Sequence, residues 1–121
     1  MSQKILIVED EEYIAEMYKI RFEMSGYEIV LAADGQEGID MAIKEKPDLV
    51  LLDLVMPNKN GYQVLEELRA NPETKGLKIF ILSNLGQKEE IDKGLSLGAD
   101  GFYVKAHMTP TELLDKIKEI L

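Results

Sequence analysis

The sequence predicts an α/β fold, a doubly wound five-stranded parallel sheet covered by five helices. Short, continuously apolar runs of strand length alternate five times with longer segments of helical periodicity. Strands that are apolar on both sides are typical of parallel sheets with helices on both faces. Right-handed crossovers between such strands favour a doubly wound topology. At 121 residues the chain has the size of one domain, expected to span residues 1–121.

Five strands are predicted from runs rich in β-branched, aliphatic or aromatic residues. They span residues 5–8, 27–32, 49–52, 78–82 and 101–104. The first and third are continuous aliphatic runs, which indicates burial on both faces. The second is interrupted by Glu28 and reads as an edge strand.

Five helices are predicted between and after these strands. They span residues 11–24, 35–46, 62–69 and 88–97, and the fifth begins at Pro110. Each carries apolar residues at helical spacing, which predicts the face that is turned to the core. The predicted inward residues are Ile14, Met17, Tyr18 and Phe22; Ile39, Ala42 and Ile43; Val64, Leu65 and Leu68; Ile91 and Leu95; and Leu113, Leu114, Ile117, Ile120 and Leu121.

The ends of the helices carry recognisable signals. Gly26 lies just past the end of the first helix, and Pro47 terminates the second. The last helix has a capping box, with Thr109 as N-cap and Glu112 within its first turn. Gly94 lies inside the fourth helix, where it costs about 1 kcal/mol relative to alanine.

Composition and charge disfavour several classes of partner. The net charge of −9 argues against binding to nucleic-acid phosphates or to an anionic membrane, so neither partner is expected. No cysteine is present, which excludes disulfides and thiolate metal sites. The apolar run at residues 5–8 is too short for a signal peptide or a membrane span, so a cytoplasmic location is predicted.

Polar residues follow four of the predicted strands. In doubly wound sheets the ligand crevice lies outside the carboxyl ends of the strands. The stretch "DLVLLD" places an aspartate, Asp53, directly at such an end, where a buried charge needs compensation. The full set is Glu9, Asp10 and Glu11, then Asp53, Ser83 and Lys105.

The chemistry of this set points to phosphoryl transfer. Oxygen ligands without histidine or cysteine favour a hard cation, and few protein ligands suggest Mg²⁺. Asp53 is a candidate nucleophile, because carboxylates form aspartyl-phosphates. Lys105 and the Ser83 hydroxyl would supply charge and a hydrogen bond to the transferred group.

Each of these residues also has an ordinary structural interpretation. An aspartate after a strand is commonly an N-cap or a turn former, and Glu11 is explained by a favourable charge at a helix N-terminus. Ser83 could be a turn residue and Lys105 a solvated lysine. It is the joint pattern, with complementary groups at four strand ends, that favours a functional site.

The sequence resembles the response-regulator receiver domains of two-component signalling, of the chemotaxis-regulator type. The resemblance covers essentially the whole chain and implies a flavodoxin-like sheet with strand order 2-1-3-4-5. It is carried by "ILIVEDE", "DLVLLDLVMPNKNG", "IFILSN" and "LGADGFYVK".

The resemblance implies a role for five residues of the set, and Lys105 matches the family's catalytic lysine. Asp53 would be the phosphoacceptor. The metal would be held by Asp10, Asp53 and the backbone carbonyl of Val55, with Glu9 acting through water. Ser83 and the aromatic Phe102 would be the switch residues.

It also implies the partners. A histidine kinase, a phosphotransfer protein or a small phosphodonor would supply the phosphoryl group in the presence of Mg²⁺. The face formed by the fourth helix, fifth strand and fifth helix would then act on a downstream target or output domain. The protein would catalyse its own phosphorylation and dephosphorylation but turn over no external substrate, so it is not expected to be an enzyme in the usual sense.

Some positions depart from the family's pattern. Ala106 follows Lys105 where the family has a proline after a cis bond, so a trans bond is expected here. Asn84 replaces a small residue and is expected to narrow access to the site. Arg69 is the last arginine, so the charged dimer pairing of many DNA-binding regulators is not expected. Val55 and Leu85 are apolar, which predicts slow autodephosphorylation.

Alternative functions fit the sequence less well. A phosphatase of the haloacid dehalogenase kind needs a second acid two residues after the nucleophile, where Val55 stands. A flavin or nucleotide carrier needs a Gly-, Ser- or Thr-rich loop after the first strand, which here reads "VEDEEY". A receiver that docks without being phosphorylated stays open. No output domain is expected within this chain, which would be either a stand-alone receiver or part of a larger protein.

Overall fold

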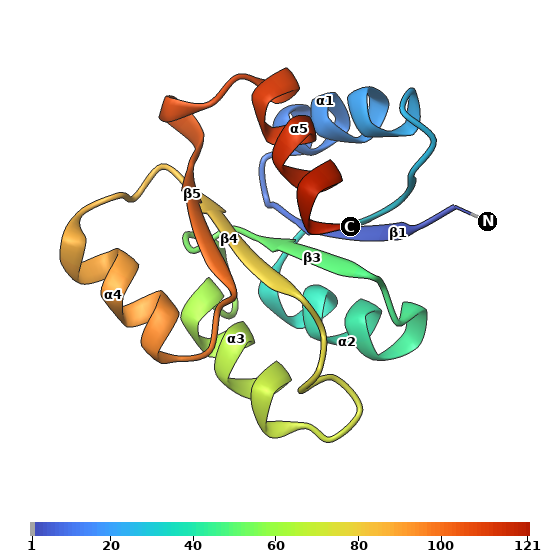
Figure 1. The fold of residues 1–121 in the computed structure, drawn as a ribbon. Coiled ribbons are helices and arrows are strands. Elements are labelled where there is room, and N and C mark those ends of the chain that lie inside the picture. Colours follow the sequence, from blue (N-terminus) through green and yellow to red (C-terminus); the bar gives the residue numbers. More distant parts are fainter. Residues whose placement is uncertain (1) are drawn as a thin grey trace.

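A five-stranded parallel sheet forms the centre of the molecule, in a computed structural model that describes residues 2–121. The strand order is β2-β1-β3-β4-β5, as expected, and helices cover both faces (Figure 1). The strands are β1 (Lys4–Val8), β2 (Glu28–Ala32), β3 (Leu49–Leu52), β4 (Ile79–Ser83) and β5 (Gly101–Val104). The helices are α1 (Glu12–Glu23), α2 (Gly35–Glu45), α3 (Gly61–Ala70), α4 (Lys88–Ser96) and α5 (Pro110–Ile120), with a short 3₁₀ helix at Lys105–His107.

All ten predicted elements are present, with their ends within about one residue of the prediction. The end signals act as expected. Gly26 follows α1 with φ of 94°, a left-handed conformation that favours glycine. At the start of α5, the Thr109 hydroxyl accepts a hydrogen bond from the Glu112 amide, and the Glu112 carboxylate accepts one from the Thr109 amide.

Two apolar cores lie on opposite faces of the sheet, because successive strand residues point to opposite sides. One core joins the sheet to α2 and α3, and Phe102 of β5 packs against its edge. The other core joins the sheet to α1 and α5. Residues fully buried in this second core include Ile5, Leu49, Phe22, Leu113 and Ile117.

For two residues, the prediction that they lie in the core is wrong. Met17 of α1 is exposed, because the helix turns Ala15, Tyr18 and Phe22 to the sheet and Met17 lies toward the opposite side. Leu95 of α4 is also exposed, because the buried position of α4 is its neighbour, Gly94.

Gly94 allows α4 to approach the sheet closely. A Cβ atom at this position would lie 2.6 Å from Cδ1 of Ile81 and 3.4 Å from Cδ2 of Phe102. The glycine that weakens the helix locally is therefore required by packing.

A polar cluster around Arg69 joins the end of α3 to the chain segments before β4 and after α4. The Arg69 guanidinium donates hydrogen bonds to the carbonyl of Gly98 at 2.9 Å, to those of Lys75 and Leu77 at 2.9 and 2.6 Å, and to Asp100 Oδ2 at 3.0 Å. Asp100 Oδ2 also accepts a hydrogen bond from the Ile79 amide at 2.8 Å. Five donor–acceptor contacts thus close the end of the sheet that lies opposite the predicted site.

Within residues 2–121, no helix is long and apolar enough to cross a membrane.

Candidate functional site

The predicted site residues come together at the carboxyl end of the sheet. Glu9 and Asp10 follow β1, Asp53 follows β3, Ser83 ends β4 and Lys105 follows β5. Parallel pairing of these strands brings their carboxyl ends to the same edge. A small pocket of about 160 Å³ opens there, lined by Asp10, Glu11, Asp53, Val55, Ser83, Asn84, Leu85 and Lys105.

Asp53 is buried but has partners for its charge. Its Oδ1 accepts a hydrogen bond from the Leu54 amide at 2.7 Å, and its Oδ2 lies 3.3 Å from the Lys105 ammonium. Its own amide donates to the Val8 carbonyl of the neighbouring strand at 3.0 Å. The carboxylate is thus compensated at the rim of the core, and its position is tied to the sheet.

Lys105 lies between two carboxylates. Its ammonium forms ion pairs with Glu9 and Asp53, and all three side chains are largely buried. Burial lowers the pKa of Lys105, but the hydrogen bond to Glu9 and the charges of Asp53 and Glu9 outweigh this, so the pKa is raised. Burial raises the pKa of Glu9, against the effect of its hydrogen bond with Lys105. The lysine is therefore held in its charged form at the acidic cluster.

Three carboxylates form a group that fits a hard cation. Oxygen atoms of Glu9, Asp10 and Asp53 all lie within 4.8 Å of one another, and Asp10 is exposed at the mouth of the pocket. The donors are all oxygens, and like charges so close together favour a divalent cation between them. The sequence predicted this trio, but it did not predict that Glu9 also pairs with Lys105.

Ser83, the last residue of β4, forms part of the pocket wall. Its side chain is buried, and its Oγ accepts a hydrogen bond from the Leu85 amide at 3.3 Å. Asn84 and Val55 also line the pocket, and both are exposed. Asn84, which was expected to narrow access to the site, therefore lines the pocket, as do Val55 and Leu85, which were expected to slow autodephosphorylation.

The Lys105–Ala106 peptide bond is trans, as expected, and residues 2–121 contain no cis peptide bond. The three residues from Lys105 to His107 form a single turn of 3₁₀ helix. Phe102, the predicted switch aromatic, is half-buried between the sheet and α4.

Gly61 supports the site but was missed by sequence reasoning. A Cβ atom at Gly61 would lie 2.3 Å from the Asp53 carbonyl oxygen, and the Gly61 amide donates to the Leu54 carbonyl at 2.9 Å. The start of α3 thus packs directly on the backbone of the candidate nucleophile. The signal that could have found it is the "NKNG" turn, whose Asn60 caps α3 by accepting from the Gln63 amide.

The comparisons with known proteins all point to one protein family. A family model described as the response regulator receiver domain matches residues 5–118. The alkaline phosphatase synthesis transcriptional regulatory protein PhoP of Bacillus subtilis is 40% identical, and the match covers 100% of this chain and 49% of that protein. The DNA-binding dual master transcriptional regulator RpaA of Synechocystis sp. is 33% identical over 98% of this chain and 48% of its own length.

Solved structures of the same fold agree closely. The chemotaxis protein CheY4 of Vibrio cholerae superposes with a TM-score of 0.92 at 30% identity, covering 100% of both chains. A CheY-like receiver domain protein from Methanospirillum hungatei gives a TM-score of 0.90 at 32% identity, covering 99% of this chain and 94% of that one.

The chain spans about half the length of the curated relatives it matches. The name of RpaA describes DNA binding, which does not match the expectation that nucleic acid is not a partner.

Proposed function

This chain belongs to the response regulator receiver domains of two-component signalling, whose general role is to accept a phosphoryl group, and from this premise we propose that Asp53 is the acceptor. The observation that carries the proposal is the position of Asp53. It is a buried carboxylate at the carboxyl end of β3, in contact with Lys105 and close to two further carboxylates.

The proposed donor is a phosphohistidine on a histidine kinase or a phosphotransfer protein. An oxygen of the Asp53 carboxylate attacks the phosphorus, the nitrogen–phosphorus bond breaks, and the electron pair returns to the imidazole, which takes up a proton. Almost all the catalysis in such a transfer is positioning and charge stabilisation. Lys105 would stabilise the charge on the transferred oxygens, and the Ser83 hydroxyl would donate a hydrogen bond to one of them.

The acidic trio would hold Mg²⁺ through Asp10, Asp53 and the Val55 carbonyl, with Glu9 acting through water. When bound, the ion would neutralise charge on the phosphoryl oxygens. Without it, the three carboxylates would repel an approaching phosphoryl group. The donor set of oxygens alone supports this choice of metal.

Phosphorylation is proposed to act on the face formed by α4, β5 and α5. Ser83 ends β4 in the pocket, and Phe102 lies on β5 beside α4, so both connect the site to that face. A hydrogen bond from Ser83 to the phosphoryl group would favour one of two arrangements of this region. A downstream target or an output domain would recognise that arrangement, and no external substrate would be turned over.

The test is the intact mass of the protein after incubation with acetyl phosphate and Mg²⁺. A gain of one phosphate is expected, abolished by Asp53→Asn and by removal of Mg²⁺. Asp48→Asn is the matched control, because Asp48 precedes the same strand at its opposite end, where its carboxylate accepts from the Lys4 amide. Equal labelling of Asp53→Asn would contradict the assignment of the acceptor.

Lack of labelling by acetyl phosphate has a defined next step. Asn84 on the rim would narrow access for a small donor, so the experiment is repeated with a phosphorylated histidine kinase. No transfer from a panel of such kinases would favour a receiver that docks without phosphorylation.

The lifetime of the phosphorylated form is proposed to be long. Val55 and Leu85 both line the pocket and are apolar, so neither can orient a water molecule toward the phosphoryl group. Following the phosphorylated mass after removal of the donor checks this. Loss within seconds would contradict it.

A further inference from the structure

The side chain of Tyr62 joins the first turn of α3 to the first turn of α4. Tyr62 is the second residue of α3 and is half-buried at the edge of the core that joins the sheet to α2 and α3. Its hydroxyl donates a hydrogen bond to the backbone carbonyl of Glu90 at 3.2 Å. The ammonium of Lys93, further along α4, lies 4.3 Å from the centre of the Tyr62 ring. One side chain of α3 therefore holds α4 through a hydrogen bond and a cation–π contact.

The first turn of α4 has little else to hold it. Of the nine residues of α4, all of which the structure describes, only Gly94 is buried, and Ile91 is half-buried. Lys88 is exposed, and its ion pair is with Asp92 of the same helix. A helix that buries so little apolar surface gains little free energy from packing. The hydrogen bond from Tyr62 is therefore a large share of what fixes this turn.

The backbone that carries Tyr62 is tied to the proposed acceptor. The Leu54 amide donates a hydrogen bond to Asp53 Oδ1 at 2.7 Å, and the Leu54 carbonyl accepts one from the Gly61 amide at 2.9 Å. Gly61 also lies so close to the Asp53 carbonyl that no Cβ atom fits. Because Tyr62 follows Gly61 directly, the contacts that fix the backbone at Asp53 also fix the position of Tyr62.

The hydrogen bond between Tyr62 and Glu90 fits only one position of α4. A hydrogen bond is lost once donor and acceptor separate beyond about 3.5 Å, and this one is already 3.2 Å long. The first turn of α4 follows the short loop of residues 84–87, and Asn84 and Leu85 of that loop line the pocket. A change in the pocket that moves this loop therefore also moves Glu90 away from the Tyr62 hydroxyl.

We propose that Tyr62 is a positioning residue, which holds α4 in the arrangement of the unphosphorylated chain and so opposes the change that phosphorylation brings about. This inference rests on the proposed function of Asp53. A bond that exists in only one of two arrangements biases the equilibrium between them. Loss of the hydroxyl should therefore favour the other arrangement by about two- to tenfold, the usual net contribution of one hydrogen bond. Burial and the charge of Glu90 raise the pKa of Tyr62, so the hydroxyl keeps its proton and can donate.

The first experiment compares amide NMR spectra of the native chain and Tyr62→Phe in the presence of Mg²⁺, with and without acetyl phosphate. Phenylalanine keeps the ring and removes only the hydroxyl. Without the phosphodonor, the signals of residues 88–92 in Tyr62→Phe are expected to lie part of the way from those of the unphosphorylated native chain to those of the phosphorylated one. Tyr27→Phe is the matched control, because Tyr27 is also half-buried but precedes β2, at the end of the sheet opposite the pocket. This control should leave residues 88–92 unchanged.

The second experiment measures the affinity for beryllium fluoride, a non-covalent analogue of the phosphoryl group, in the presence of Mg²⁺. A ligand that favours one arrangement binds more tightly to a variant in which that arrangement is already more populated. The Kd should therefore fall by about two- to tenfold in Tyr62→Phe and stay the same in Tyr27→Phe. Lys93→Met removes the charge that lies over the ring and should lower the Kd by a smaller factor.

The outcomes separate this inference from the proposed function. A native chain that takes up no phosphate from acetyl phosphate or from a histidine kinase would overturn both. If the native chain is labelled, an unchanged spectrum and analogue affinity in Tyr62→Phe would overturn the inference alone. Weaker analogue binding would also overturn it, because the bond would then belong to the phosphorylated arrangement. A lower free energy of unfolding with an unchanged analogue affinity would show that Tyr62 only stabilises the fold.

Discussion

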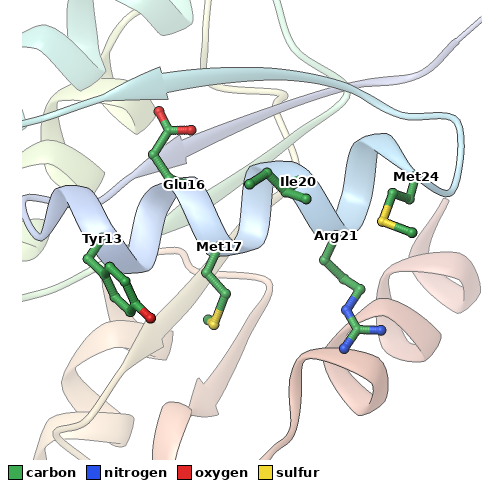
Figure 2. Close-up of a pocket in the computed structure, with 6 residues that line it drawn as sticks. All are labelled: Tyr13, Glu16, Met17, Ile20, Arg21 and Met24. Atoms are coloured by element: carbon green, nitrogen blue, oxygen red, sulfur yellow. The ribbon is translucent and has the colours of Figure 1, made fainter.

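Helices α1 and α5 cover the same face of the sheet but differ in what they leave outside. In α5 the apolar residues Leu113, Leu114 and Ile117 are buried, and the exposed surface is mostly charged. In α1 the buried residues Ala15, Tyr18 and Phe22 are matched by an apolar stripe on the opposite side. The exposed residues of this stripe are Tyr13, Met17, Ile20 and Met24 (Figure 2). Folding alone explains the pattern of α5. The pattern of α1 exceeds what the core requires, so burial in the core does not account for its outer side.

The largest expected effect comes from shortening one side chain on the buried side of α1, compared with one on its exposed side. Phe22 is fully buried and stacks on Tyr18 with ring centroids 5.6 Å apart. Phe22→Ala should lower the free energy of unfolding by about 3–5 kcal/mol. Ile20→Ala, on the exposed stripe, should change it by less than about 0.5 kcal/mol. Urea unfolding at low protein concentration measures both, and equal losses would mean that the two sides of α1 are not distinct.

A second helix sharpens the contrast, because α4 buries a glycine instead of an apolar side chain. Alanine in place of glycine usually stabilises a helix by about 1 kcal/mol. Gly94→Ala should instead destabilise the protein by about 1–3 kcal/mol, since the new methyl group would overlap Ile81. Gly76→Ala is the control, because a Cβ there meets nothing within 4 Å. Thermal unfolding of both variants decides the matter, and a stabilised Gly94→Ala would count against tight packing of α4.

The first turns of α1 and α5 also differ. Thr109 caps α5 by accepting a hydrogen bond from the Glu112 amide at 3.1 Å, whereas Glu11 makes no such bond at the start of α1. Thr109→Ala should cost about 1 kcal/mol of unfolding free energy. Glu11→Ala should cost less than about 0.5 kcal/mol. A similar loss in both variants, measured by urea titration, would show that the capping bond adds nothing.

The smallest expected effect is the pH dependence of the same capping box. Hydrogen bonds from the Thr109 backbone and side chain hold the pKa of Glu112 below its ordinary value. A lowered pKa in the folded state contributes stability that is present above the ordinary glutamate pKa and is lost as the pH falls through the lowered pKa. The stability difference between the native chain and Glu112→Gln should therefore shrink on acidification. A difference that is constant with pH would contradict this.

Much of the site could be predicted because a parallel sheet determines where strand ends lie. Once Asp53, Ser83 and Lys105 are recognised as residues at strand ends, the topology alone brings them to one edge. The grouping of the carboxylates of Glu9, Asp10 and Asp53 follows for the same reason. The partners within the site could not be predicted this way. Sequence position says nothing of whether the Lys105 ammonium reaches Glu9 as well as Asp53.

The fold was predictable at the level of elements but not of helix orientation or close packing. Two apolar stripes compete on α1, and only the sheet decides that Tyr18 and Phe22 are inside and Met17 is outside. Gly61 and Gly94 read as turn and helix-weakening residues in the sequence. Their role depends on neighbours that are distant in the chain, the Asp53 carbonyl and the Ile81 side chain.

The Arg69 cluster has a mechanical consequence for α4. Its hydrogen bonds hold Gly98 and Asp100, and so anchor the end of α4 that is far from Asp53. The other end of α4 follows the short loop of Asn84 and Leu85, at the rim of the pocket. Because the Gly98 end of α4 is held, any displacement of the helix is expected to be smallest near Gly98 and to grow along the helix toward the pocket. Arg69 thus holds the far end of α4 in place, and the end that follows the pocket loop is the one expected to move most.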